Sequence, residues 1–223
     1  MTVSSVIART ASLHCRLISL VNGAILPGVR QTAPALLPVL RSRLVGDLLA
    51  LVLAHPERSW TLDELADRVG APYQTVTAEV RRLEQADLVS TRSVGRSKLV
   101  TANADNPYIR PLTELVTMAF GPPLVLAEEF ADVAGIEGLW LYGSWAARHA
   151  GAPGRPPADV DVLVVGDVDR DEVYDAARRA EHRLGREVNT TVRTRRAWKR
   201  ADDAFAATVK DSPMVELPGP WAA

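Results

Sequence analysis

The stretch LWLYGSWAARHAGAPGRPPADVDVLVVG, Leu139–Gly166, decides the fold of the second half of this 223-residue chain. It predicts a short apolar strand, Leu139–Tyr142, then a Gly143-Ser144 turn and a helix-like segment, Trp145–Ala150. Gly143 permits a tight turn, and the amides and hydroxyl that follow can receive a phosphate group at the start of the helix. The first part of the stretch therefore predicts a strand, a turn and a phosphate-binding helix N-terminus.

An acidic pair opens the second strand of this stretch, after a Gly/Pro-rich loop. Asp159 and Asp161 are two residues apart, so in a strand both carboxylates project from the same face of the sheet. Val160, Val162 and Val164 would pack on the opposite face. Mg²⁺ prefers hard oxygen ligands and accepts water or phosphate oxygens in its remaining positions. The pair therefore predicts a magnesium site, and the alternative is a loop-exposed acidic pair after an ordinary strand.

The combined pattern resembles a known catalytic core. A strand, Gly-Ser, a helix containing Ala-Arg, a loop and Asp-x-Asp at the start of an apolar strand are similar to the nucleotidyltransferase core of the DNA polymerase β superfamily, in particular its minimal, MNT-like branch. The resemblance extends from residue 139 to about residue 192 and implies a nucleoside triphosphate as ligand or substrate and Mg²⁺ as cofactor. The residues that it implies for nucleotide or metal binding are Gly143, Ser144, Arg148, Asp159 and Asp161.

One part of the superfamily pattern is missing. The superfamily usually places a third carboxylate on a neighbouring strand, where it helps to activate the attacking hydroxyl. The candidate strand here is Glu187–Val192, and the aligned residue is Asn189, which cannot act as a base. Glu187 lies on the same strand face, one residue pair early, and is the candidate catalytic substitute beside Asp159 and Asp161. Nucleotide and metal binding are thus predicted, and catalysis is left open.

Composition bounds the class of protein. Hydrophobic residues make up 47% and charged residues 24%, as in ordinary soluble globular domains. Residues 1–122 carry 13 basic and 10 acidic side chains, and residues 123–223 carry 13 basic and 17 acidic ones. This asymmetry fits an N-terminal part that binds nucleic acid and a C-terminal part that binds a metal. Cys15 is the only cysteine, the four histidines lack zinc-ligand spacing, and no apolar run approaches the ~18 residues of a membrane helix. We therefore expect a cytoplasmic protein without disulfides, structural zinc or membrane contact.

A second motif precedes the first in the chain, in TLDELADRVGAPYQTVTAEVRRLEQADLV, Thr61–Val89. Thr61 and Glu64 form a capping box, Gly70 ends a short helix, and a second helix follows from Pro72 to about Ala86. Two strands joined by a hairpin at Gly95 come next, and a leucine-rich helix from Pro38 precedes the motif. Residues 38–103 resemble the winged-helix domain of bacterial ArsR- or MarR-like regulators.

This resemblance implies that the chain binds double-stranded DNA. The second helix would enter the major groove, with cations on the helix and hairpin near phosphates. The predicted base-edge residues are Tyr73, Gln74, Thr75 and Thr77, and the predicted phosphate contacts are Arg81, Arg82, Arg92, Arg96 and Lys98. The alternative is an ordinary solvated helix face and hairpin, because winged helices also serve as protein-interaction modules.

The sequence predicts an α/β (α+β) protein with four segments: a flexible extension (1–35), a winged helix-turn-helix domain (36–104), linking helices (105–135) and a small nucleotidyltransferase-type mixed sheet with flanking helices (136–223). The leading hypothesis is a transcriptional regulator with a nucleotide-binding and Mg²⁺-binding second domain. The alternative is an active enzyme that transfers a nucleoside monophosphate to a hydroxyl group of RNA, protein or a small molecule. A third hypothesis is a toxin–antitoxin component with a small helical toxin partner. A homodimer is expected from the habit of winged-helix regulators.

Overall fold

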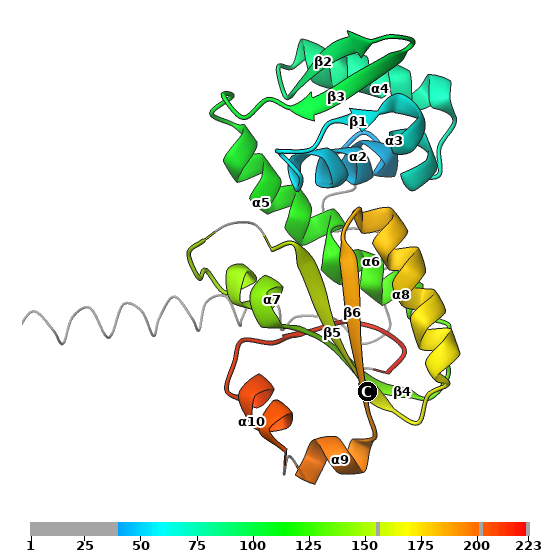
Figure 1. Ribbon diagram of the computed structural model, residues 1–223, viewed down its shortest axis with the longest axis vertical. Coiled ribbons are helices and arrows are strands. Elements are labelled where there is room, and N and C mark those ends of the chain that lie inside the picture. Colours follow the sequence, from blue (N-terminus) through cyan, green and yellow to red (C-terminus); the bar gives the residue numbers. More distant parts are fainter. Residues whose placement is uncertain (1–39, 155–156, 201–202, 222–223) are drawn as a thin grey trace, which may run out of the picture. The chain divides into compact units, whose positions relative to one another are not determined.

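The computed structural model of the protein describes residues 40–154, 157–200 and 203–221, and residues 34–223 form one compact unit (Figure 1). The predicted extension, residues 1–35, lies outside the described residues. The architecture is mixed α/β with two small sheets, as the sequence predicted at this coarse level.

The first sheet belongs to a winged helix-turn-helix. Its strands are arranged in the order β1-β3-β2, and both pairs are antiparallel. Three helices and the β2–β3 hairpin follow the order expected of this topology. The elements are α2 (Arg43–Leu53), β1 (Trp60–Thr61), α3 (Leu62–Arg68), α4 (Tyr73–Gln85), β2 (Val89–Val94) and β3 (Ser97–Ala102).

Local capping decides where the first helices begin. The predicted helix from Pro38 is wrong in its start, because α2 begins at Arg43, where the Ser42 hydroxyl accepts a hydrogen bond from the Val45 amide at 3.4 Å. The predicted cap of α3 is confirmed, since the Thr61 hydroxyl accepts from the Glu64 amide at 3.1 Å. Side-chain oxygens at these positions satisfy helix amides that have no intrahelical partner.

The two helices predicted as linkers each belong to a hydrophobic core. Val116 and Phe120 of α5 (Ile109–Phe120) pack in the core of the winged helix, whereas Val125 of α6 (Pro122–Glu129) packs in the second core. The Phe120 ring lies so close to Gly46 of α2 that a Cβ there would be 2.3 Å from the ring. The chain thus passes from one core to the other at Gly121.

The second sheet has four strands in the order β6-β5-β4-β7. The β5–β6 pair is parallel and the β4–β5 and β4–β7 pairs are antiparallel. The predicted Gly143-Ser144 turn is wrong in detail, because Gly143 is already the first residue of a helix. The elements are β4 (Ile136–Tyr142), α7 (Gly143–His149), β5 (Asp159–Gly166), α8 (Arg170–Leu184), β6 (Glu187–Arg193), α9 (Arg195–Arg200), α10 (Ala204–Lys210) and β7 (Val215–Glu216).

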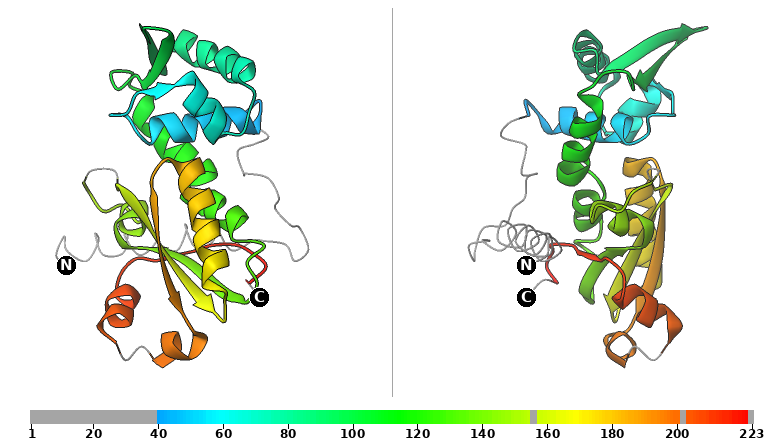
Figure 2. Two further views of the ribbon diagram at one scale, coloured as in Figure 1. Left: turned by 45° about the vertical axis from the view of Figure 1, so that its right-hand side comes forward. Right: turned by 90° about the vertical axis from the view of Figure 1, so that its left-hand side faces the viewer.

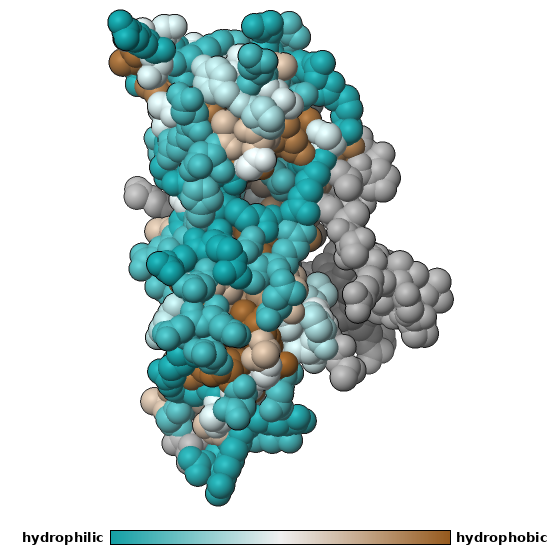
Figure 3. Space-filling view, turned by 90° about the vertical axis from the view of Figure 1, so that its right-hand side faces the viewer, coloured by the Kyte–Doolittle hydropathy of each residue, from teal (hydrophilic) through white to brown (hydrophobic). Residues whose placement is uncertain are grey.

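The two faces of β5 differ as the alternation predicted. Val160, Val162 and Val164 are fully buried in the core that α6 and α8 complete, whereas Asp159 and Asp161 are half-buried on the other face. Helix α8 runs alongside the sheet (Figure 2), and the side of the molecule that carries it is mainly hydrophilic (Figure 3). No helix within the described ranges is long and apolar enough to cross a membrane.

Candidate functional site

The exposed side of α4 carries most of the predicted base-edge residues. Tyr73, Gln74 and Thr75 form an exposed first turn, while Val76 and Val80 anchor the helix in the core. The first turn is therefore rigidly supported and open to a ligand.

Thr77 differs from the other predicted base-edge residues. Its side chain is half-buried, and its hydroxyl donates to the Tyr73 carbonyl at 2.8 Å. The hydroxyl is thus already engaged within α4, so Thr77 is a poorer candidate for contact with a base.

The predicted phosphate-binding cations fall into two groups. Arg82 pairs with Glu79 at 2.7 Å and Lys98 pairs with Glu84 at 3.3 Å, so carboxylates offset part of their charge. The remaining three are exposed on α4 and the β2–β3 hairpin and make no ion pair with any described residue. They are Arg81, Arg92 and Arg96.

A residue that the sequence did not single out orients α4. Glu79 is 9% exposed, and its carboxylate accepts hydrogen bonds from Arg41 and Arg82. The charge of Glu79 is thus compensated from two elements, which ties α4 to the segment before α2. In the sequence, the pairing of Glu79 with Arg82 was indicated only by their spacing of three residues.

The structure brings the two aspartates and Asn189 together on one face. Asp161 is opposite Asn189 in the parallel β5–β6 register, and Asp159 is opposite Glu187. The Asn189 side-chain amide donates to Asp159 Oδ2 at 3.1 Å. Burial, with the charge of Asp159, raises the pKa of Asp161. A cation here would relieve the repulsion between the two carboxylates.

Gly143 packs directly against this acidic pair. Its φ is +69°, and a Cβ at this position would lie 2.2 Å from Asp161 Oδ2. Both the backbone conformation and the space therefore require glycine. Ser144 follows as an exposed residue in the first turn of α7.

Arg148 and Glu187 are the two remaining residues that the sequence predicted for this site. The Arg148 guanidinium donates to the Ala152 carbonyl at 2.6 Å, which holds it on the loop after α7. Glu187 is exposed, and no three acidic, histidine or cysteine side chains of the described chain gather as a metal-binding group. Its catalytic role stays a prediction.

An aromatic pocket of about 390 Å³ adjoins the acidic pair. Gly143 and Tyr142 form one side, and α10 forms the other, with the Phe205 ring perpendicular to Tyr142 at 5.6 Å. The Arg193 guanidinium lies 4.9 Å from the centre of the Phe205 ring. The sequence did not indicate this pocket, because it depends on how α10 returns to the sheet.

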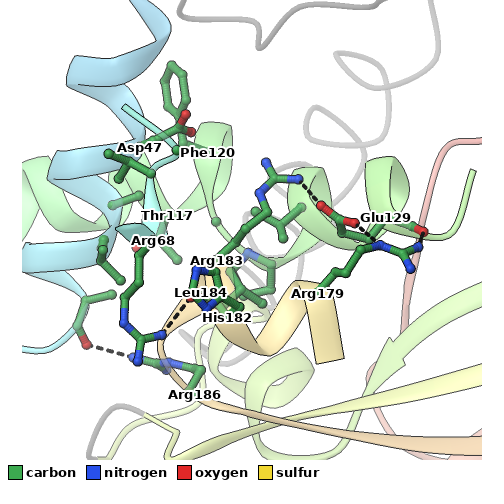
Figure 4. Close-up of a pocket in the computed structure, with 18 of the residues that line it drawn as sticks. Asp47, Arg68, Thr117, Phe120, Glu129, Arg179, His182, Arg183, Leu184 and Arg186 are labelled. Atoms are coloured by element: carbon green, nitrogen blue, oxygen red, sulfur yellow. Dashed lines mark hydrogen bonds and ion pairs between the residues drawn. The ribbon is translucent and has the colours of Figure 1, made fainter. Parts of the chain in front are cut away.

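A larger cavity, of about 820 Å³, lies where the winged helix meets α8 (Figure 4). Its charged walls are connected by shared carboxylates, since Glu128 binds both Arg43 and Arg183, at 2.6 and 2.8 Å. Burial alone would raise the pKa of Glu128, but these two hydrogen bonds lower it overall. Arg179 and Arg183 likewise share Glu129.

The end of α8 is hydrogen-bonded to the winged helix beside this cavity. Arg68 donates to the His182 carbonyl at 2.6 Å, and His55 Nε2 lies 2.9 Å from the Leu184 carbonyl oxygen. Burial, with the nearby charge of Arg186, lowers the pKa of His55 to about 4. His55 is therefore neutral at pH 7 and donates its Nε2 proton to Leu184. These bonds satisfy carbonyls at the helix end.

No protein-family model and no curated protein matches the chain. Among solved structures, it is similar to a MarR-family transcriptional regulator from Rhodococcus sp. RHA1, at 22% identity and a TM-score of 0.33 over 53% of this chain and 76% of that one. It is also similar to MepR, a transcription regulator of the Staphylococcus aureus multidrug efflux pump MepA, at 22% identity and 0.30 over 34% and 56%. AF1382 from Archaeoglobus fulgidus matches at 13% identity and 0.33 over 39% and 98%.

Proposed function

We propose that this protein is a DNA-binding transcriptional regulator whose second domain binds a nucleoside triphosphate with Mg²⁺. The observation that supports DNA binding best is the surface of the winged helix. The first turn of α4 is exposed and polar, its opposite side is fixed in the core, and the adjacent hairpin carries Arg92 and Arg96 without carboxylate partners among the described residues. We call α4 and this hairpin the recognition surface.

The recognition surface matches the physical requirements of duplex DNA. An α-helix fits into the major groove, where Gln74 and Thr75 can exchange hydrogen bonds with base edges. The arginines would contact phosphates, which fix the position of the helix and release condensed counterions. Two copies of the chain related by a two-fold axis would read a palindromic site.

The first test needs no knowledge of the operator. We expect binding to any duplex to weaken with salt, and Arg92→Ala/Arg96→Ala to reduce the slope of log affinity against log salt by roughly 2, at about 0.9 for each lost phosphate contact. The matched control is Arg110→Ala/Arg178→Ala, which removes two arginines whose side chains are 90% and 75% exposed on α5 and α8. An equal change of slope in the two variants would show that only net charge matters and would refute the assigned surface.

The acidic pair supports nucleotide and Mg²⁺ binding. Asp159 and Asp161 share one face, Asn189 donates one hydrogen bond to Asp159, and Gly143 leaves space for the Asp161 carboxylate. Asp159 and Asp161 would hold Mg²⁺, and the metal would supply positive charge to a bound phosphate group. The residues of this chain would hold the metal and orient the triphosphate, with Ser144 as a phosphate contact.

Calorimetric titration of ATP, GTP, CTP and UTP with Mg²⁺ tests this second part of the proposal. We expect one nucleotide or more to bind and Asp159→Ala/Asp161→Ala to abolish binding. Asp105→Ala/Asp132→Ala is the matched control, because both aspartates are exposed and distant in sequence from the pair. If none of the four nucleotides binds to the unaltered protein, nucleotide binding is refuted and DNA binding is left untouched.

Catalysis is a second candidate function. Glu187 is exposed and lies opposite Asp159 in the sheet register, where its carboxylate could accept a proton from an acceptor hydroxyl. In an active enzyme, that hydroxyl would attack the α-phosphorus and pyrophosphate would leave. We expect Glu187→Gln to lose pyrophosphate release while it retains nucleotide binding. Equal turnover in this variant would remove Glu187 from the mechanism.

A further inference from the structure

Arg186 connects the acidic pair to the winged helix. It lies between the end of α8 and β6 (Figure 4), and its two terminal nitrogens bind different parts of the chain. Nη1 donates to the Pro157 carbonyl at 2.7 Å, and Nη2 donates to the Ala54 carbonyl at 2.8 Å. Ala54 caps the C-terminal end of α2, and Pro157 is two residues before Asp159. One rigid guanidinium thus connects the end of α2 to the segment just before Asp159.

The Asp159 carboxylate favours the charged form of Arg186. Burial lowers the pKa of the Arg186 guanidinium, and the Asp159 carboxylate acts in the opposite direction. Within the described ranges, no carboxylate forms an ion pair with Arg186, whose hydrogen-bond acceptors are carbonyls and the His55 ring. A half-buried cation of this kind is sensitive to any charge that is added beside Asp159.

The surroundings of Arg186 leave little room for independent movement. The preceding residue, Gly185, has a φ of +69°, and a Cβ there would lie 2.8 Å from Trp60 and 3.1 Å from Leu51 of the winged helix. His55 Nδ1 is 3.5 Å from Arg186 Nη2, and the His55 Nε2 atom is hydrogen-bonded to the Leu184 carbonyl. A displacement of the guanidinium therefore disturbs the end of α2 directly.

We propose that Arg186 is a positioning residue that couples occupancy of the acidic pair to the attachment of the winged helix. This inference rests on the proposed cation site and adds a regulatory connection to it. A divalent cation on Asp159 cancels the attraction for Arg186 and repels the guanidinium, so the bond to Ala54 weakens and the end of α2 opens. Because coupling between sites is reciprocal, any change that releases Arg186 from the winged helix also alters cation affinity.

A double-mutant cycle tests the coupling between Asp159 and Arg186 without metal, by amide hydrogen exchange of the whole chain. Asp159→Asn removes the charge that favours Arg186, so we expect exchange at the Ala54 and His55 amides to accelerate at least about fivefold, the lower end of typical couplings. Asp161→Asn is the matched control, since it neutralises the other carboxylate. In the Arg186→Gln background, Asp159→Asn should have no further effect. Equal acceleration by the two aspartate variants, or by Asp159→Asn in both backgrounds, would overturn the proposal.

A second experiment adds Mg²⁺ and tests the cation site separately from its coupling to the winged helix. Mg²⁺ should accelerate exchange at Ala54 and His55 in the unaltered protein. Arg186→Lys keeps the charge but lacks the two-pronged fork that reaches Ala54, so we expect no exchange response and, because the coupling is reciprocal, a Mg²⁺ affinity about fivefold tighter than the original. Circular dichroism establishes that each variant is folded. No Mg²⁺ binding by the unaltered protein refutes the cation site, whereas binding without an exchange response refutes the coupling.

Discussion

Replacing Asn189 by aspartate would place a third carboxylate beside the acidic pair. The Asn189 amide now donates to Asp159 Oδ2 at 3.1 Å, and an aspartate would replace this hydrogen bond with a repulsion between like charges. A hydrogen bond to a charged acceptor contributes about 1.5 kcal/mol at a half-exposed site, at the low end of its usual range. Two like charges about 4 Å apart add roughly 1 to 2 kcal/mol at intermediate screening. We therefore expect Asn189→Asp to destabilise the metal-free protein by about 3 kcal/mol at pH 8.

Thermal unfolding measures this effect, and for a chain of this size about 3 kcal/mol corresponds to a fall in Tm of roughly 6 to 12 °C. The sign of the pH dependence follows from the raised pKa of the new carboxyl group in the folded protein. The folded variant binds more protons than the unfolded chain above the unfolded pKa of about 3.9, so its deficit grows as pH rises from there. Saturating Mg²⁺ should recover most of the deficit, because binding to the folded state alone stabilises it.

Two control variants make this reasoning refutable. Asn103→Asp is the matched control, because Asn103 donates to Asp87 Oδ1 at 2.9 Å on an exposed surface away from the acidic pair. It should lose stability and be stabilised by Mg²⁺ no more than the unaltered protein is, because it leaves the acidic pair unchanged. Asn189→Ala removes the hydrogen bond without adding charge and should show about half of the deficit. If Asn189→Asp has an unchanged Tm at pH 8, or gains no more from Mg²⁺ than Asn103→Asp, the carboxylate at position 189 adds nothing to the proposed cation site and the reasoning is refuted.

Three further variants test the local geometry. Gly185→Ala should lower the free energy of unfolding, measured by chemical denaturation, by about 2 kcal/mol. The loss combines left-handed backbone strain of about 1 to 2 kcal/mol with crowding against Trp60. Gly70→Ala is the control, because Gly70 has a similar φ but open space around it, so only the strain should be lost. Gly143→Ala should lose Mg²⁺ and nucleotide binding, since its Cβ would displace the Asp161 carboxylate; unchanged affinity would contradict that contact. His55 has its pKa lowered to about 4, so its contribution to stability is complete above pH 6.5 and is lost as pH falls towards 4. His55→Gln should flatten the stability curve in that window, and a curve parallel to that of the original protein would contradict a buried neutral ring.

Short-range patterns in the sequence predicted most elements of the fold. Alternation placed Asp159 and Asp161 on one face of β5 and Val162 on the other, because side chains of a strand alternate by geometry alone. The Thr61 cap and Gly70 just after α3 followed from helix ends that need partners for their backbone groups. These signals act over a few residues, so they can be read without knowing what lies across the chain.

The positions of other groups depended on contacts between distant segments. Glu79 compensates Arg41 across 38 positions of sequence, and Arg186 reaches Ala54 across 132, so neither pairing leaves a local pattern. The same holds for the start of α2 at Arg43, where a serine cap prevailed over a hydrophobic pattern that began earlier.

The sequence by itself determined the two chemical surfaces, the recognition surface and the acidic pair, since each is built from residues on one or two adjacent elements. Only the tertiary structure decided that α5 and α6 belong to separate cores, that Asn189 binds Asp159, and that one guanidinium lies between the acidic pair and the winged helix. The physical reason is that hydrogen-bond partners and charges act through space, and burial selects which distant groups must satisfy each other.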